Sequence, residues 1–184
     1  SGTLVAPDIV VTAGHCIETL SECQNTRFVF DYLYTADGVL APLEEDDVYS
    51  CVEILSRQDG VLDYAYLRLS RDVVGHTPAT LSPGIASTCR NVVDEQAVTV
   101  LGFGSGVPLK IDSGGMVTAA STRGTNFFLT SLDTFAGNSG SGVFDASGQL
   151  VGVLSSGLSD YRTRVSEGCD EVNTLTEPFG GEQI

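Results

Sequence analysis

The sequence predicts an all-β fold, and three features of its 184 residues support this prediction. Short runs rich in Val, Ile, Thr, Tyr and Phe alternate with Gly, Asp and Ser, which is typical of strands joined by turns. No segment of useful length has the apolar spacing of a helix. With 42% apolar residues and 21 glycines, the chain can fill a core and is rich in turns rather than disordered.

The expected strands fall into two sets separated by a long connection. Those of the first set are residues 2–5, 9–12, 27–32, 48–55 and 64–69. Those of the second set are residues 97–103, 116–122, 127–131, 142–145 and 150–155. The Pro7-Asp8 turn signal predicts a tight hairpin between the first two strands, and residues 71–95 lack periodicity. We therefore expect two small barrels, at residues 1–82 and 83–184, that pack face to face around a cleft.

The charge balance excludes several classes of partner. The net charge is −15, from 24 acidic and nine basic residues. A negative field repels nucleic acid and anionic lipid and favours cationic polypeptides, although most of the acidity is explained by the solubility of a secreted protein. The longest apolar stretches, such as residues 9–13, are far shorter than the roughly 20 residues of a membrane-spanning helix. We expect no nucleic acid and no membrane as a partner.

The cysteines indicate export but do not define a pairing. They are Cys16, Cys23, Cys51, Cys89 and Cys169, an odd number without metal-ligand spacing. We expect no metal and no cofactor, and either two disulfides with one free thiol or a pairing partner outside this chain. Cys16 and Cys23 are close enough in sequence to close a small loop, but other pairings remain open. Cysteine usage of this kind favours a secreted or periplasmic protein.

Three short motifs contain a candidate base, an orienting carboxylate and a nucleophile, in the order His, Asp, Ser. His15 follows the second expected strand, Asp63 precedes the strand at 64–69, and Ser139 lies within a Gly-Asn-Ser-Gly-Ser-Gly run. A serine hydroxyl needs a base within hydrogen-bond reach, and that base must be held in one tautomer by a third group. His15 is the candidate base, because the other histidine, His76, is better interpreted as a solvated imidazole in the connection. Each motif alone would be a strand end or a glycine-serine turn, but together they indicate one catalytic site.

These motifs resemble those of the trypsin-like serine peptidases of the chymotrypsin fold. Asn138 before the nucleophile and Ser141 after it are most similar to the bacterial glutamyl endopeptidase branch. The resemblance implies two packed six-stranded Greek-key β-barrels, with terminal strands that can be absent from this chain. The chain starts one strand late for such a first barrel, and we also expect it to end without the last strand and helix. It implies a serine endopeptidase that works through an acyl-enzyme, and segments of a longer precursor are additional candidate partners.

Several further residues are candidates for binding the substrate. The glycines around Ser139 allow the loop to aim the amides of Gly137 and Ser139 at one point, which forms an oxyanion hole. By the resemblance, Ser155, Ser156 and Gly157 would pair with an extended peptide.

Asp133 occupies the position that in trypsin places a carboxylate at the base of the specificity pocket. This would favour Arg or Lys before the scissile bond, and the alternative is an Asp that stabilises a turn. Glutamate specificity is not expected, because Leu154 stands where the glutamyl endopeptidases carry a histidine.

Two alternatives to the endopeptidase differ in class. One is a binding module on the protease fold that has lost catalysis, although such modules usually lack a triad residue. The other is an esterase with the same triad, but the Gly-x-Ser-x-Gly elbow of that fold is missing. The endopeptidase therefore remains the leading hypothesis.

Overall fold

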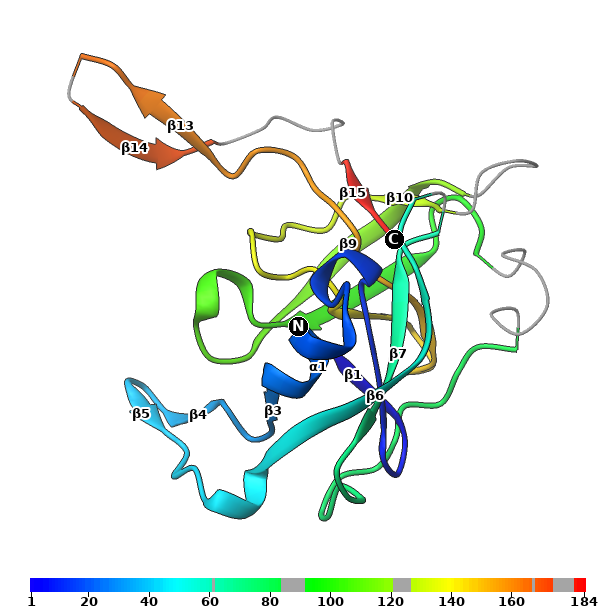
Figure 1. The fold of residues 1–184 in the computed structure, drawn as a ribbon. Helices are drawn as coiled ribbons and strands as arrows, with labels where there is room; N and C mark the ends of the chain where they lie inside the picture. The colour runs from blue at the N-terminus through cyan, green and yellow to red at the C-terminus, as the bar shows by residue number, and fades with distance from the viewer. Residues whose placement is uncertain (61, 84–91, 121–126, 167, 174–180) are drawn as a thin grey trace.

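The protein is built from two curled antiparallel sheets, and the predicted all-β fold is confirmed (Figure 1). The computed structural model describes residues 1–60, 62–83, 92–120, 127–166, 168–173 and 181–184. Each sheet comes from one half of the chain and buries its own clusters of apolar side chains. A site that needs residues from both halves must therefore form where the two sheets meet.

The first sheet has five strands in the order β1-β2-β7-β6-β3 within the described residues, one fewer than the expected barrel. The strands are β1 (Thr3–Ala6), β2 (Ile9–Thr12), β3 (Arg27–Val29), β6 (Val48–Gln58) and β7 (Tyr64–Leu69). Along β7, Ala65, Leu67 and Leu69 are buried, and the residues between them are partly exposed. This period of two made β7 recognisable from sequence. The hairpin expected around Pro7-Asp8 joins β1 to β2.

The second sheet has six strands in the order β12-β11-β8-β9-β10-β15. The strands are β8 (Ala97–Gly102), β9 (Lys110–Ala119), β10 (Leu129–Thr130), β11 (Gly142–Asp145), β12 (Leu150–Val153) and β15 (Glu182–Gln183). The expectation that no final strand forms is wrong, because β15 pairs with β10. β9 begins before the predicted residue 116, and the predicted residues 121 and 122 lie outside the described residues. Polar residues and two glycines hid the first part of β9. At one of them, Gly115, the strand packs so closely on Leu132 that a Cβ would overlap that side chain.

One short helix, α1 (Leu20–Asn25), was not predicted. Its N-terminus has a capping box, in which Thr19 accepts from the Glu22 backbone and Glu22 accepts from the Thr19 backbone. A disulfide joins Cys23 of α1 to Cys51 of β6, and both cysteines are buried. The suggested loop between Cys16 and Cys23 is therefore not formed. Cys16 and Cys169 are exposed free thiols, and Cys89 lies outside the described residues.

Besides the turn η1 (Gly14–Cys16), the described residues form two hairpins and two further short turns. The hairpin strands are β4 (Tyr34–Ala36) with β5 (Val39–Leu40), and β13 (Tyr161–Arg164) with β14 (Cys169–Val172). The turns are η2 (Glu45–Asp47) and η3 (Gly104–Gly106). The β13–β14 hairpin extends away from the two sheets (Figure 1). Sequence did not predict these strands, because nearly all of their residues are exposed and so no apolar alternation marks them.

Candidate active site

His15 and Asp63 form a hydrogen-bonded pair at the ends of two neighbouring strands. His15 lies in the turn η1 (Gly14–Cys16) after β2, and Asp63 precedes β7, which pairs with β2. The distance from His15 Nδ1 to Asp63 Oδ2 is 2.7 Å, and the His15 backbone N–H donates to Asp63 Oδ1 at 2.9 Å. Because an ionised carboxylate only accepts, Nδ1 must carry the ring proton. Nε2 of the neutral ring is then left as a proton acceptor.

The position of His15 depends on the glycine before it. A Cβ on Gly14 would overlap the Gln58 carbonyl oxygen and lie 2.9 Å from that of Tyr64. The Gly14 carbonyl also accepts a hydrogen bond from Arg57 Nε at 2.8 Å. The turn that carries the histidine is therefore pressed against the paired strands β6 and β7, which fixes it beside Asp63.

Asp63 also accepts a hydrogen bond from the second half of the chain. Ser155 Oγ donates to Asp63 Oδ2 at 2.6 Å. Partial burial raises the pKa of Asp63, but the hydrogen bonds from Ser155 and His15 together outweigh burial, so this pKa lies below its usual value. The carboxylate is therefore ionised at neutral pH, as is needed to orient His15. Sequence analysis assigned Ser155 to substrate binding and did not predict this contact, which joins residues 92 positions apart.

Ser139 lies in a tight loop before β11. Two glycines in the loop have positive φ angles, 93° at Gly137 and 80° at Gly140, which side chains rarely adopt. Buried Asn138 holds the loop from inside, because its Oδ1 accepts from Ser141 Oγ at 3.1 Å. The side chains of Ser141 and Asn138 together fill the space where Gly102 at the end of β8 has no Cβ. Sequence analysis did not predict this internal support.

The loop of Ser139 packs directly on the segment that leads to His15. A Cβ on Gly140 would overlap Thr12 Oγ1 and lie 2.8 Å from the Ala13 nitrogen. The Gly140 amide donates to the Leu154 carbonyl at 2.7 Å, next to Ser155. Through these contacts the structure brings Ser139, His15, Asp63 and Ser155 to one place between the sheets. Within the described residues no hydrogen bond joins Ser139 Oγ to His15, and such catalytic hydrogen bonds often tighten only when substrate binds.

Comparison with known proteins agrees with this geometry. The family model of the trypsin-like peptidase domain matches residues 1–153. The chain belongs to this family. A Glu endopeptidase structure has a TM-score of 0.60 and 19% identity, over 99% of this chain and 78% of that chain. Rv3671c from M. tuberculosis H37Rv, solved as an inactive serine-to-alanine mutant, has a TM-score of 0.53 and 16% identity, over 83% of this chain and 68% of that chain.

No curated protein gives a significant sequence match to this peptidase domain. The two structural likenesses are below 25% identity and therefore support the fold alone. They confirm the predicted chymotrypsin-type arrangement of two curled sheets.

Two backbone amides in the loop of this peptidase domain are available for a ligand. Among the described residues, the N–H groups of Gly137 and Ser139 donate to no other group. Amides without partners cost free energy when buried, and here they are accessible because Gly137 is exposed and Ser139 is partly exposed. Both can donate to an oxygen atom placed beside the Ser139 hydroxyl.

The segment from Ser155 to Gly157 has an alternating set of free backbone groups. Ser156 pairs with β15, since its carbonyl accepts from the Gln183 amide at 2.8 Å and its own amide donates to the Gln183 carbonyl at 3.4 Å. The Ser156 hydroxyl also donates to the Gln183 side chain at 3.1 Å. The Ser155 carbonyl and both backbone groups of Gly157 have no partner in the described part of the chain. They can pair with an added strand, whereas the backbone of Ser156 is already used.

Two carboxylates lie near this segment. Asp133 is exposed, and its backbone amide donates to Asp112 Oδ2 on β9 at 2.8 Å. Glu182, which sequence analysis did not single out, is 7% exposed. Burial raises the pKa of Glu182 to about 7; hydrogen bonding from Thr134 lowers it, and the charges of Asp160 and Asp133 raise it further. No sequence motif marks Glu182, because only the pairing of β15 brings it here.

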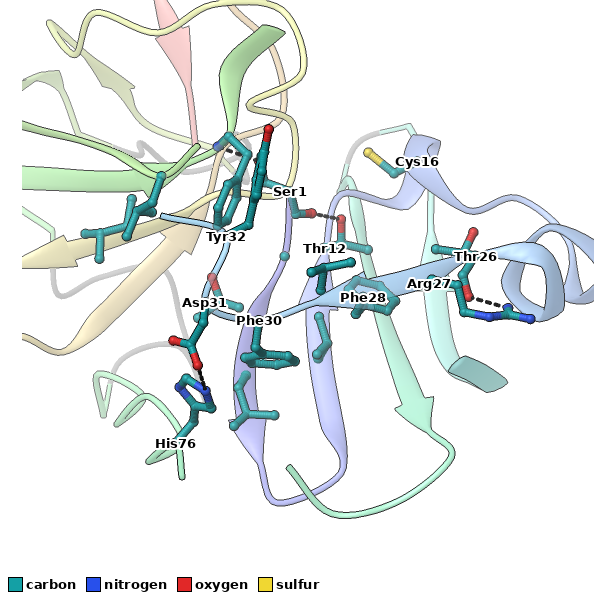
Figure 2. Close-up of a pocket in the computed structure, with 18 of the residues that line it drawn as sticks. Ser1, Thr12, Cys16, Thr26, Arg27, Phe28, Phe30, Asp31, Tyr32 and His76 are labelled. Carbon is teal, nitrogen blue, oxygen red and sulfur yellow. Dashed lines mark hydrogen bonds and ion pairs between the residues drawn. The ribbon is translucent and has the colours of Figure 1, made fainter. Parts of the chain in front are cut away.

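A mostly apolar groove of about 680 Å³ lies along the first sheet (Figure 2). It contains His76, which was expected to be a solvated imidazole. The His76 side chain is 31% exposed, and two contacts also hold it: Nε2 lies 3.3 Å from Asp31 Oδ2, and the ring packs on Phe30 with centroids 5.0 Å apart. His76 is thus held in this groove, and His15 is the histidine bonded to Asp63.

The described residues contain no helix that is both long and apolar enough to cross a membrane. In the same residues, no three His, Cys, Asp or Glu side chains are grouped so that they could hold a metal ion.

Proposed function

We propose that this chain is a serine endopeptidase that hydrolyses polypeptides through an acyl-enzyme on Ser139. The observation that carries the proposal is the His15–Asp63 pair, with a 2.7 Å hydrogen bond that keeps the ring proton on Nδ1. Nε2 is then the base for the Ser139 hydroxyl, whose loop packs on the residues before His15. A peptidase family implies a polypeptide substrate, and the serine-type mechanism is the finer step proposed here.

In the first half of the reaction, Ser139 Oγ attacks the carbonyl carbon while its proton moves to His15 Nε2. The carbonyl oxygen gains the negative charge and accepts hydrogen bonds from the free amides of Gly137 and Ser139. Asp63 stabilises the imidazolium that forms. When the C–N bond breaks, Nε2 gives the proton to the leaving amine, and the acyl group remains on Ser139.

In the second half, water attacks the acyl-enzyme and gives a proton to His15 Nε2. The Ser139 oxygen leaves and takes the proton back, so the carboxylic acid product is released and the enzyme is restored. The substrate would lie as an added strand against the Ser155 carbonyl and the backbone of Gly157, which are free to pair. We also propose that Arg or Lys precedes the scissile bond, because Asp133 and the net charge of −15 favour cationic side chains.

Two broader proposals follow from the sequence. We place the two barrels at residues 1–82 and 83–184, on either side of the connection. A secreted or periplasmic location is supported by the buried Cys23–Cys51 disulfide, because such bonds persist in oxidising compartments.

Digestion of a mixed peptide library, followed by mass spectrometry, tests the function. We expect internal cleavage by the parent protein and none by Ser139→Ala. Ser147→Ala is the matched control, because Ser147 is an exposed serine in the turn between β11 and β12, and it should cleave like the parent. A folded parent protein that cleaves no peptide would contradict the proposal and leave a non-catalytic binding module on this fold.

A further inference from the structure

The carboxylate of Glu182 is buried and incompletely paired. The residue is 7% exposed, and its Oε2 is buried without a hydrogen-bond partner in the described residues. Buried carboxylate oxygens are normally satisfied, so one without a partner indicates a missing ligand or a functional role. The reaction proposed above gives Glu182 no role.

Glu182 lies between two segments that lead away from Ser139: the first is residues 136–141 and the second is residues 154–160. Near Ser139 the segments are joined by the Leu154 amide, which donates to the Ser141 carbonyl at 2.9 Å. Farther out they are joined again, because the Ala136 amide donates to Asp160 Oδ2 at 2.7 Å. Glu182 comes from β15, which is hydrogen-bonded to the second segment. The carboxylate therefore borders the space enclosed by the two segments.

Gly157 provides the closest approach. A Cβ at Gly157 would overlap both the carboxyl carbon and Oε2 of Glu182. Gly157 is two residues from Ser155, which donates to the triad carboxylate Asp63. A peptide paired with Gly157 and attacked by Ser139 has to direct the side chain before its scissile bond into the space that Glu182 borders.

The negative charges around this space determine which kind of substrate side chain can bind there. Asp133 and Asp160 face Glu182 closely enough that each raises its pKa. Three carboxylates repel an acidic side chain and leave an aliphatic one beside an unpaired oxygen. These carboxylates do not form a metal-ligand group among the described residues. A guanidinium or ammonium group supplies both the positive charge and the donors that Oε2 lacks.

We propose that Glu182 is the specificity-determining residue, and that its carboxylate receives the cationic end of an Arg or Lys side chain that precedes the scissile bond. This inference rests on the proposed peptidase function and identifies the residue that binds the substrate side chain before the scissile bond. Asp133 and Asp160 then act at longer range, by making the space more negative. The Gly at position 157 is required because any side chain there would occupy the place of the carboxylate.

This assignment implies a pH dependence of selectivity. Glu182 has a pKa of about 7, raised by its burial and by Asp160 and Asp133, while Thr134 hydrogen-bonds to it and acts in the opposite direction. Above pH 7 the carboxylate is charged and attracts a cation. Below pH 7 it becomes protonated, so the preference for a cationic side chain should decrease as pH falls from 8 to 5.5.

Calorimetric binding to the Ser139→Ala protein separates this inference from catalysis. The ligands are two acetylated tetrapeptides with the sequence Ala-Ala-Pro-X, in which X is arginine or its neutral isostere citrulline. At pH 8 we expect the arginine peptide to bind at least tenfold more tightly, as charge-assisted hydrogen bonds are stronger than neutral ones. At pH 5.5 the ratio should be several-fold smaller, and the added substitution Glu182→Gln should remove most of the preference at pH 8 and leave a ratio that no longer changes with pH.

Two further variants test whether the preference for the arginine peptide depends on Glu182 in particular. Glu45→Gln changes the net charge equally at an exposed glutamate of η2 and should keep the parent ratio. Asp133→Asn should lower the ratio less than Glu182→Gln does. Equal binding of the two peptides at pH 8, or no binding of either, would overturn the assignment. So would a preference that is as large in Glu182→Gln as in the parent. If Glu182→Gln does not fold, the pH series on the Ser139→Ala protein decides alone. Failure of the peptidase proposal is seen separately, as a lack of peptide cleavage by the parent protein.

Discussion

Replacement of Asp63 by Asn should reduce kcat/KM by about four orders of magnitude. Three donors converge on the carboxylate: the Nδ1–H and backbone N–H of His15, and the hydroxyl of Ser155. An amide has one accepting oxygen and one donating nitrogen. If the oxygen faces Nδ1, the NH₂ group opposes the backbone N–H of His15. If the amide is flipped, its NH₂ group faces Nδ1 and forces the ring proton to Nε2, where it blocks proton acceptance.

Two free-energy contributions make up the expected loss of activity in Asp63→Asn. Loss of one hydrogen bond to a charged acceptor costs roughly 1.5–3 kcal/mol. The attraction between a carboxylate and the imidazolium formed in the reaction is about 4 kcal/mol at 4 Å, with the effective dielectric constant typical of a partly exposed site. Together these amount to about 5.5–7 kcal/mol, and each 1.36 kcal/mol is a factor of ten in rate. We therefore expect a decrease of at least about 10⁴-fold.

The assay is kcat/KM at pH 8 with a peptide that the parent cleaves. Asp37→Asn is the matched control, since Asp37 lies exposed in the turn between β4 and β5, and it should retain parent activity. Ser155→Ala removes only one of the three donors and should cause a smaller decrease, about 10-fold. A decrease of less than tenfold in Asp63→Asn, with the fold intact, would refute the orienting role.

Three further changes test the structure around the site. Gly140→Ala should decrease activity by at least about 10²-fold, because its Cβ would push the Ser139 loop off Thr12, and such misplacement strongly reduces rate. Gly148→Ala is its control: Gly148 also has a positive φ, of 73°, but has no neighbour within 4 Å of the Cβ position, so stability should fall while activity stays. Replacing Cys23 and Cys51 by Ala opens a link between positions 28 residues apart and should cost about 3.5 kcal/mol. Calorimetry should then show a Tm lower by roughly 7–14 °C, and an unchanged Tm would contradict the reasoning. Glu182→Gln should make stability less dependent on pH: the folded-state pKa of about 7 exceeds the ordinary 4.5, so the parent loses stability as pH rises between these values. Denaturant titrations at pH 5 and pH 8 check this, and equal pH dependence of parent and variant would contradict it.

Local sequence signals predicted most of the fold. β2, β7 and β11 were located with their bounds, because each is a short apolar or alternating run between turn residues. The helix α1 was missed although Thr19 and Glu22 have the spacing of a capping box, since six residues are too short for a helical period to show. The exposed hairpins were missed for a related reason: without a buried face there is no alternation to detect.

The candidate site could be predicted only as far as its residues carry local motifs. His15, Asp63 and Ser139 each lie in a short recognisable segment. The contact of Ser155 with Asp63 and the approach of Glu182 to Gly157 depend on the pairing of distant strands. These contacts could not be read from composition or spacing. The first lowers the pKa of Asp63, and the second places a carboxylate beside Gly157.

The most direct test of the account is the labelling of Ser139 by a fluorophosphonate probe, measured by intact mass and peptide mapping. A hydroxyl activated by His15 should form one adduct per chain, located at Ser139. His15→Ala should slow labelling by at least about 10³-fold, because the nucleophile and the base act as a unit. Rapid labelling of Ser139 in His15→Ala, or no adduct in the folded parent protein, would contradict the account.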